Sequence, residues 1–209
     1  METTTPQTDN WYLYGLSANP PTNAHYEIIK HINSMNATLT VFPAYKHPIK
    51  TNLIDFEHRV NMLNLLCDPL ENVQVSQIEK EFTINTTYEL IVLLRSRVQL
   101  NEATQFIIVC DYFIMMDILD MKRAQSSDLL ESEDIGFCVI LNNSNDITQN
   151  KCDIIQHNNN DNQNISFIVL NTIDESVRST NFRNNNNLMD TLLPDIVCSY
   201  IKANDLIFA

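Results

Sequence analysis

Residues 11–25 read Trp-Tyr-Leu-Tyr-Gly-Leu-Ser-Ala-Asn-Pro-Pro-Thr-Asn-Ala-His. The first four are a short apolar and aromatic run, which is typical of a buried strand. The run stops at Gly15 and a Pro-Pro turn, and Thr22 is suited to cap a helix that continues to about Asn33. A strand, a tight turn and a helix in this order predict the opening of a parallel α/β unit.

The remaining chain repeats this alternation of strand and helix. Further strands are expected at about 38–42, 72–79, 105–110, 136–141 and 165–170. Helices are expected at about 55–66 and 86–98, after Asp111, and at about 195–203. The continuous apolar run Phe106-Ile-Ile-Val-Cys110 is typical of a central parallel strand. We therefore predict an α/β fold, a Rossmann-like doubly wound parallel sheet in a single domain spanning residues 11–207.

Two segments are expected to lie outside this regular pattern. Residues 1–10 are polar and are predicted to form a disordered leader. Residues 142–164 are rich in asparagine and are predicted to form a loop.

Composition excludes several classes of function. The formal net charge of -13 argues against broad binding to nucleic acid or to an anionic membrane, since both need a basic surface. No apolar stretch approaches the roughly 18 residues of a transmembrane helix. The start of the chain lacks a signal peptide, so we expect a soluble protein of the cytoplasm or nucleus. The five cysteines form no CxxC pair and no zinc-spaced cluster.

The strand-to-helix turn is the first candidate site, because parallel sheets bind ligands at the carboxyl ends of their strands. Thr22 and His25 are three residues apart, which places both side chains on one face of the first helical turn. The unpaired N–H groups and the helix dipole there favour an anion such as phosphate. A capping threonine beside an incidental histidine is the alternative interpretation.

Several segments together resemble the nicotinamide/nicotinate mononucleotide adenylyltransferases, members of the H/T-x-G-H nucleotidyltransferase superfamily. Ser17-Ala-Asn-Pro-Pro-Thr-Asn-Ala-His25 is similar to the first motif of that family. Arg178-Ser-Thr-Asn-Phe-Arg183 is similar to its Ser-Ser-Thr-x-Ile-Arg motif. Weaker similarities occur at Pro43–Lys46, His58–Met62, Glu79, Thr86–Leu90, Phe106–Asp111 and Leu193–Leu206. The resemblance runs in order over roughly residues 11–207.

The resemblance implies adenylyl transfer from ATP to nicotinamide or nicotinate mononucleotide, forming NAD or its acid form and pyrophosphate. It implies catalytic roles for His25, Thr22, Lys46 and Arg183. The implied ATP-binding residues are Ser17, His25, Asp111, Ser179, Thr180 and Arg183. The implied mononucleotide-binding residues are Gly15, Leu16, Ser17, Lys46, Thr87 and Tyr88.

Some details of this implied site carry alternatives. Lys50 competes with Lys46 for the phosphate contact, and Arg59 is expected to be structural. Mg²⁺ would be carried by the ATP phosphates, so no metal-binding cluster of protein residues is expected. The partners are ATP and a pyridine mononucleotide, with neither nucleic acid nor membrane, and the resemblance is compatible with a homo-oligomer.

The chain departs from the family at three glycines, which are replaced by Leu16, Ala24 and Val109. Glycine is used where backbone approaches a ligand closely, so Leu16 and Val109 would place side chains beside the two nucleotides. A non-catalytic nucleotide-binding relative is therefore one alternative. Another transferase on the same scaffold, such as a pantetheine-phosphate adenylyltransferase or a cytidylyltransferase, is a second.

Overall fold

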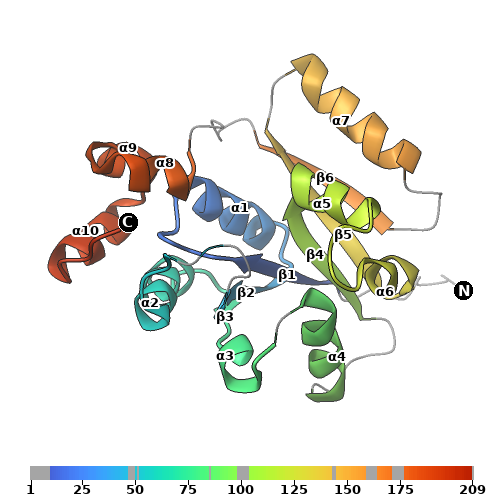
Figure 1. Ribbon diagram of the computed structural model, residues 1–209, viewed down its shortest axis with the longest axis horizontal. Coiled ribbons are helices and arrows are strands. Elements are labelled where there is room, and N and C mark those ends of the chain that lie inside the picture. Colours follow the sequence, from blue (N-terminus) through green and yellow to red (C-terminus); the bar gives the residue numbers. More distant parts are fainter. Residues whose placement is uncertain are drawn as a thin grey trace, which may run out of the picture.

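The computed structural model describes residues 10–46, 50, 52–84, 86–97, 104–142, 145–158, 164–170 and 177–208. Within these ranges the strands form one fully parallel sheet in the order β3-β2-β1-β4-β5-β6 (Figure 1). The strands are β1 Asn10–Leu16, β2 Thr38–Pro43, β3 Val73–Val75, β4 Gln105–Asp111, β5 Ile135–Asn142 and β6 Asn164–Leu170. The order reverses between β1 and β4, and this reversal is where open α/β sheets bind ligands.

Helices cover both faces of the sheet (Figure 1). Those before the reversal are α1 Asn23–Ser34, α2 Phe56–Cys67, α3 Ile78–Phe82 and α4 Thr87–Arg97. Those between β4 and β6 are α5 Tyr112–Leu119, α6 Ser126–Glu131 and α7 Asn145–Asn158. The chain closes with α8 Ser179–Asn184, a 3₁₀ turn at Asn186–Leu188, α9 Met189–Leu192 and α10 Asp195–Ala203.

Each face of the sheet has its own core because side chains alternate along the strands. On one face, Tyr12, Tyr14 and Leu16 of β1 pack with α1, whose Ile28, Ile29 and Ile32 are buried. On the other face, Leu13 and the even-numbered residues of β4 pack with α4, α5 and α7. A third cluster joins α8, α9 and α10 to the outer side of α2, through residues such as Met62 and Val197.

The structure confirms the α/β fold with a parallel sheet wound on both faces, and most elements begin and end within two residues of expectation. The strand expected at 72–79 is wrong beyond Val75, since the chain turns there into the short helix α3. The prediction missed α6, which has only six residues. Residue 10 already belongs to β1, and the rest of the expected leader lies outside the described residues.

The expected Asn-rich loop is also wrong over most of its length, because α7 occupies Asn145–Asn158. Thr148, Cys152 and Ile155 recur at helical spacing, and Ile155 is fully buried against the core. The asparagines around them obscure this apolar stripe in the sequence. Residues 159–163 lie outside the described residues.

Candidate nucleotide site

The β1–α1 loop, residues 15–22, leaves the sheet at the reversal between β1 and β4. Gly15 is exposed, and a Cβ added to it would meet no atom within 4 Å, so the surface beside this residue is open. Leu16 extends the ladder by accepting a hydrogen bond from the Ala44 amide at 2.9 Å. The loops after β1 and β2 therefore start from one edge of the sheet.

His25 is oriented by the cap of its own helix. The Thr22 amide donates to His25 Nδ1 at 2.9 Å, and the Thr22 hydroxyl lies 2.8 Å from the same nitrogen. Since Nδ1 accepts from a backbone N–H, the proton of the neutral ring is on Nε2. Thr22 is fully buried and has no surface for a ligand, so its contribution reaches the site through His25.

The His25 imidazole stays neutral over the physiological pH range. Burial lowers its pKa to about 4, and the nearby Lys50 ammonium lowers the pKa in the same direction. His25 thus presents a neutral N–H donor at the N-terminus of α1. A neutral donor of this kind can bind a phosphate oxygen and needs no proton transfer.

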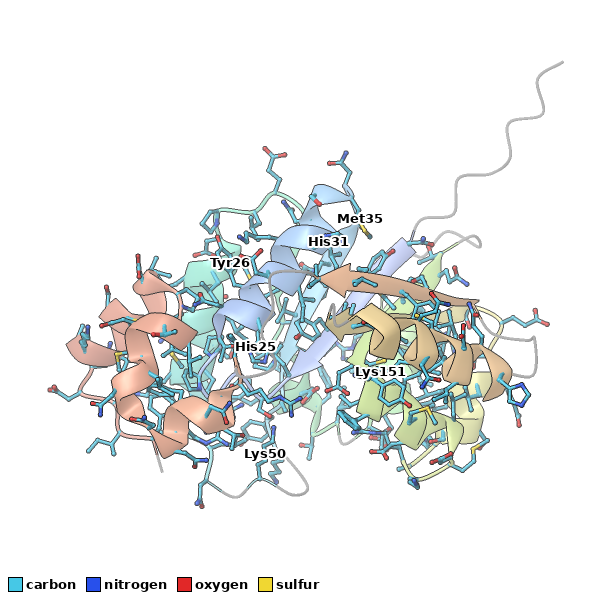
Figure 2. The ribbon with its side chains drawn as sticks, turned by 90° about the horizontal axis from the view of Figure 1, so that it is seen from above. His25, Tyr26, His31, Met35, Lys50 and Lys151 are labelled. Atoms are coloured by element: carbon cyan, nitrogen blue, oxygen red, sulfur yellow. The ribbon has the colours of Figure 1, made fainter. Side chains whose placement is uncertain are left out.

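Lys50 faces His25 at this edge of the sheet, as Figure 2 shows. Its Nζ donates to Ser17 Oγ at 2.9 Å, and burial with the neighbouring Arg183 lowers its pKa while Asp111 raises it. Lys46 is exposed, with its Nζ 5.9 Å from the centre of the Tyr45 ring. The structure therefore brings Lys50, the competing candidate, to the loop that carries Ser17.

Arg183 joins the far end of the chain to the same loop. Its guanidinium donates to the Asn19 carbonyl at 2.8 Å and to Thr180 Oγ1 at 3.1 Å. Ser179 Oγ donates to the Pro20 carbonyl at 2.8 Å. Two side chains of α8 thus bind the backbone of the β1–α1 loop and place the Arg183 cation near Lys50.

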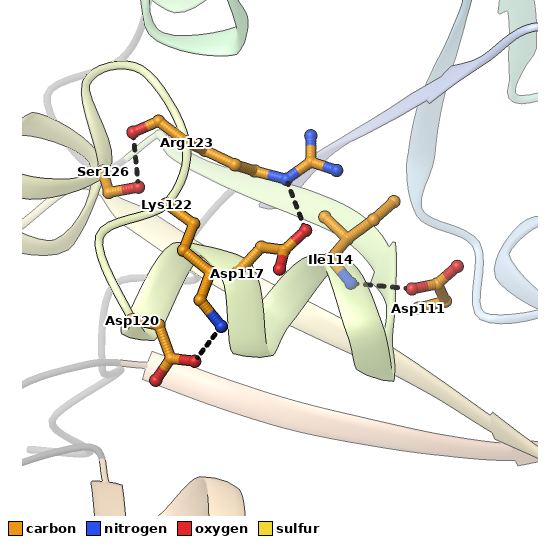
Figure 3. A network of polar contacts seen from close by, with 7 residues as sticks. All are labelled: Asp111, Ile114, Asp117, Asp120, Lys122, Arg123 and Ser126. Atoms are coloured by element: carbon orange, nitrogen blue, oxygen red, sulfur yellow. Dashed lines mark hydrogen bonds and ion pairs between the residues drawn. The ribbon is translucent and has the colours of Figure 1, made fainter. Parts of the chain in front are cut away.

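Asp111 ends β4 on the other side of the reversal. Its Oδ1 accepts the Ile114 amide at 2.8 Å and so caps α5, as Figure 3 shows. The carboxylate is exposed, and its charge raises the pKa of Lys50 and of the buried Tyr14 hydroxyl. The cap accounts for the position of Asp111, and its charge acts on the Lys50 ammonium.

Thr87 and Tyr88, the expected mononucleotide contacts, lie in the first turn of α4. A capping box starts this helix: the Thr86 hydroxyl accepts the Glu89 amide and the Glu89 carboxylate accepts the Thr86 amide, both at 3.2 Å. Tyr88 lines a pocket of about 420 Å³ together with Val92 and Gln125. None of the side chains that contact the β1–α1 loop lines this pocket among the described residues.

The side chains that replace the family glycines are directed into the molecule. Leu16 and Val109 are both buried, in the core between the sheet and α1. The open face at this position belongs to Gly15, which precedes Leu16 and has the opposite orientation along the strand. Because Leu16 and Val109 are buried in this core, the reason to expect that they block the nucleotide site no longer holds. Ala24 lies half-buried in α1.

Two buried side chains that sequence reasoning did not assign to the site hold its loops. Asn19 Oδ1 accepts the Ile54 amide, and Asn19 Nδ2 donates to the Asn52 carbonyl, both at 3.1 Å. Arg59, 2% exposed, donates to the carbonyls of Ser17, Ala44 and Ile54. The signal for Arg59 was its place on the apolar side of α2, three residues after Phe56 and four before Leu63.

The described ranges contain neither a cluster of metal-binding side chains nor a helix suited to crossing a membrane. Nowhere in them do three His, Cys, Asp or Glu side chains gather as ligands for a metal ion. None of their helices combines the length and the hydropathy that crossing a bilayer requires.

Similarities to known proteins concern the family and the fold of the chain. Residues 13–185 match the family model described as cytidylyltransferase-like. A "Probable nicotinate-nucleotide adenylyltransferase" of Acholeplasma laidlawii is 40% identical over 70 residues, which span 32% of this chain and 37% of that protein. The Plasmodium falciparum nicotinic acid mononucleotide adenylyltransferase complexed with APC superposes with a TM-score of 0.72 over 95% of this chain and 96% of that chain. At 17% identity this last similarity concerns the fold.

Proposed function

Because the chain belongs to the cytidylyltransferase-like family, we propose that it transfers the adenylyl group of ATP to the 5′-phosphate of nicotinate mononucleotide. The nicotinamide form is the alternative acceptor. The name of the Acholeplasma relative supports the acid form. The observation that carries the proposal is the convergence of His25, Lys50 and Arg183 on the β1–α1 loop.

The reaction is an in-line displacement at phosphorus. A 5′-phosphate oxygen of the acceptor forms a bond to the α-phosphorus of ATP, while the bond from that phosphorus to the bridging oxygen breaks and pyrophosphate leaves. No protein nucleophile takes part. The protein holds two anions in line and offsets the negative charge that develops between them.

Each residue of the site has a distinct part in this scheme. His25 Nε2–H donates to a phosphate oxygen that gains charge in the transition state. Lys50 and Arg183 supply the cations, and the planar fork of Arg183 suits the pyrophosphate end. Asp111 accepts a ribose hydroxyl. ATP would carry Mg²⁺ on its phosphates, which matches a site of cations and N–H donors where, among the described residues, Asp111 is the carboxylate whose charge acts on Lys50.

The direct test is an incubation with ATP, Mg²⁺ and either pyridine mononucleotide. We expect the dinucleotide and pyrophosphate in equal amounts, with the acid acceptor used faster than the amide. The absence of product from both acceptors would contradict the proposal. Replacing ATP by CTP tests the cytidylyltransferase alternative, because faster turnover with CTP would support that activity instead.

A pair of lysines in the same segment tests the proposed cation. We expect Lys50→Ala to raise the KM for ATP or the mononucleotide about tenfold, because one charge-assisted hydrogen bond to a phosphate contributes on that order. Lys46→Ala is the matched control, and we expect it to change KM less than about twofold. Equal effects of the two substitutions would contradict the assignment of Lys50.

A further inference from the structure

Arg59 is a charged residue on the apolar side of α2, and its side chain is 2% exposed. Its Nη1 donates to the Ser17 carbonyl at 2.9 Å and to the Ala44 carbonyl at 2.7 Å. Its Nε donates to the Ile54 carbonyl at 3.1 Å. One guanidinium therefore joins the β1–α1 loop, the loop after β2 and the segment before α2.

The loops joined in this way carry the residues of the nucleotide site. The carbonyl that Arg59 binds belongs to Ser17, whose hydroxyl accepts Lys50 Nζ. The next residue, Ala18, has a φ of 49°, a left-handed conformation that a residue with a Cβ rarely adopts. Local sequence therefore does not favour the shape of this loop, and contacts from distant segments must hold it.

Stability alone does not explain a buried arginine at this position. Burial lowers the Arg59 pKa, while the carboxylates of Glu79 and Glu57 raise it. Glu79 also accepts the Tyr45 amide at 3.1 Å, beside the carbonyl of Ala44. Apolar residues of similar volume often stabilise a core as well as a buried ion does. What they lack is a rigid fork that binds several carbonyls at fixed angles.

We propose that Arg59 is a positioning residue for the adenylyl transfer, setting the placement of the β1–α1 loop against the segment that carries Lys50. The inference rests on the proposed function. It assigns Arg59 no contact with substrate: Arg59 acts through the backbone of Ser17 and Ala44, and so through the position of the Lys50 ammonium at the phosphate.

The test combines Arg59→Lys with Lys50→Ala in a double-mutant cycle. We expect Arg59→Lys to lower kcat/KM by about tenfold, as Lys50→Ala does, because an effect that acts through the Lys50 ammonium cannot exceed the effect of removing it. In the Arg59→Lys background, Lys50→Ala should lower kcat/KM less than twofold, since the ammonium is already misplaced. Arg95→Lys is the control, because Arg95 pairs with Asp134 away from the site, and its effect should multiply with that of Lys50→Ala. Independent effects of Arg59→Lys and Lys50→Ala would overturn the proposal.

Hydrogen exchange separates this inference from the proposed function. Arg59→Lys should speed amide exchange in residues 15–22 and 44–46 and leave residues 105–111 unchanged, whether or not the wild-type protein turns over any nucleotide. Unchanged exchange in both loops, or equal acceleration throughout, would overturn the proposal. If Arg59→Lys fails to fold, the same exchange measurement is made on Arg59→Met, which keeps a similar side-chain volume and removes the hydrogen-bond donors. Loss of folding in both variants would also overturn the proposal, because it would assign Arg59 to stability.

Discussion

Two connections at the same edge of the sheet are held in opposite ways. The β1–α1 loop is bound by side chains far away in sequence, with Asn19 bonding residues 33 and 35 positions away and Arg183 bonding 164 positions away. The β4–α5 turn is held by Asp111, which caps the helix that follows it by accepting the amide three residues further on. A local cap needs only its own helix, whereas the first loop keeps its shape only when the rest of the domain has folded.

The proposed catalytic residues lie in the β1–α1 loop, the connection that depends on contacts with distant segments. His25, Ser17 and the partners of Lys50 and Arg183 lie in or beside residues 15–25. Long-range ties suit a site whose donors must be in place before the substrate arrives, because preorganised donors stabilise a transition state without reorganisation. Substitutions in the two connections should therefore differ both in kind and in size.

The largest effect is expected from His25→Ala. It removes the neutral Nε2–H donor, and the loss of one such donor lowers kcat by about 10²–10³-fold. The fold should persist, with unfolding free energy reduced by about 1 kcal/mol, because the Thr22 amide loses its partner. Steady-state kinetics and urea unfolding measure the two effects.

His31→Ala is the matched control, since His31 lies in the last turn of the same helix (Figure 2). Its kcat should stay within about twofold of the wild-type value. A comparable loss of kcat in both variants would show that the effect comes from the helix and is unrelated to the donor.

A smaller effect, on stability, compares the two connections directly. Asn19→Ala leaves the Ile54 amide and the Asn52 carbonyl without their partner in a buried region, which should lower the unfolding free energy by about 2–3 kcal/mol. Asp111→Ala removes an exposed helix cap worth about 1 kcal/mol. Urea unfolding of both variants decides the point, and equal losses would contradict the distinction between distant and local ties.

Local features of the site could be predicted from sequence. The spacing of Thr22 and His25 places both on one face of a helical turn, and the structure joins them by hydrogen bonds. The sequence predicts a helix directly after Asp111, and in the structure Asp111 is the N-cap of that helix.

Features that depend on distant segments could not be predicted. The position of Lys50 against Ser17 depends on the path of a whole loop, and nothing in the spacing separates it from Lys46. Arg59 is visible as a charge on an apolar face, but its three carbonyl partners come from three segments. The side to which Leu16 turns follows from the strand register at Gly15, which the sequence alone leaves open by one residue.

The smallest effect concerns pH and the two titratable groups beside these loops. Burial raises the pKa of Glu79 to about 7, although the Tyr45 amide and Arg59 both lower it, and burial lowers that of His25 to about 4. Between about pH 4.5 and 7 the folded Glu79 holds a proton that the unfolded chain releases, so its contribution to stability falls as pH rises. Between about pH 4 and 6.5 the unfolded chain protonates His25 while the folded state does not, so that contribution rises with pH.

The two contributions oppose each other over about pH 4.5–6.5, and removing one exposes the other. The unfolding free energy of Glu79→Gln minus that of the wild type should rise with pH. The expected slope is about 1 kcal/mol per pH unit after allowance for the partial exposure of this side chain. For His25→Ala the same difference should fall with pH at a similar rate over the same interval. Urea unfolding at half-unit steps of pH measures both slopes, and slopes of the same sign would show that burial does not set these two pKa values. Because Glu79 binds the loop after β2 and His25 begins α1, opposite slopes would also show that the two sides of the site respond separately to protons.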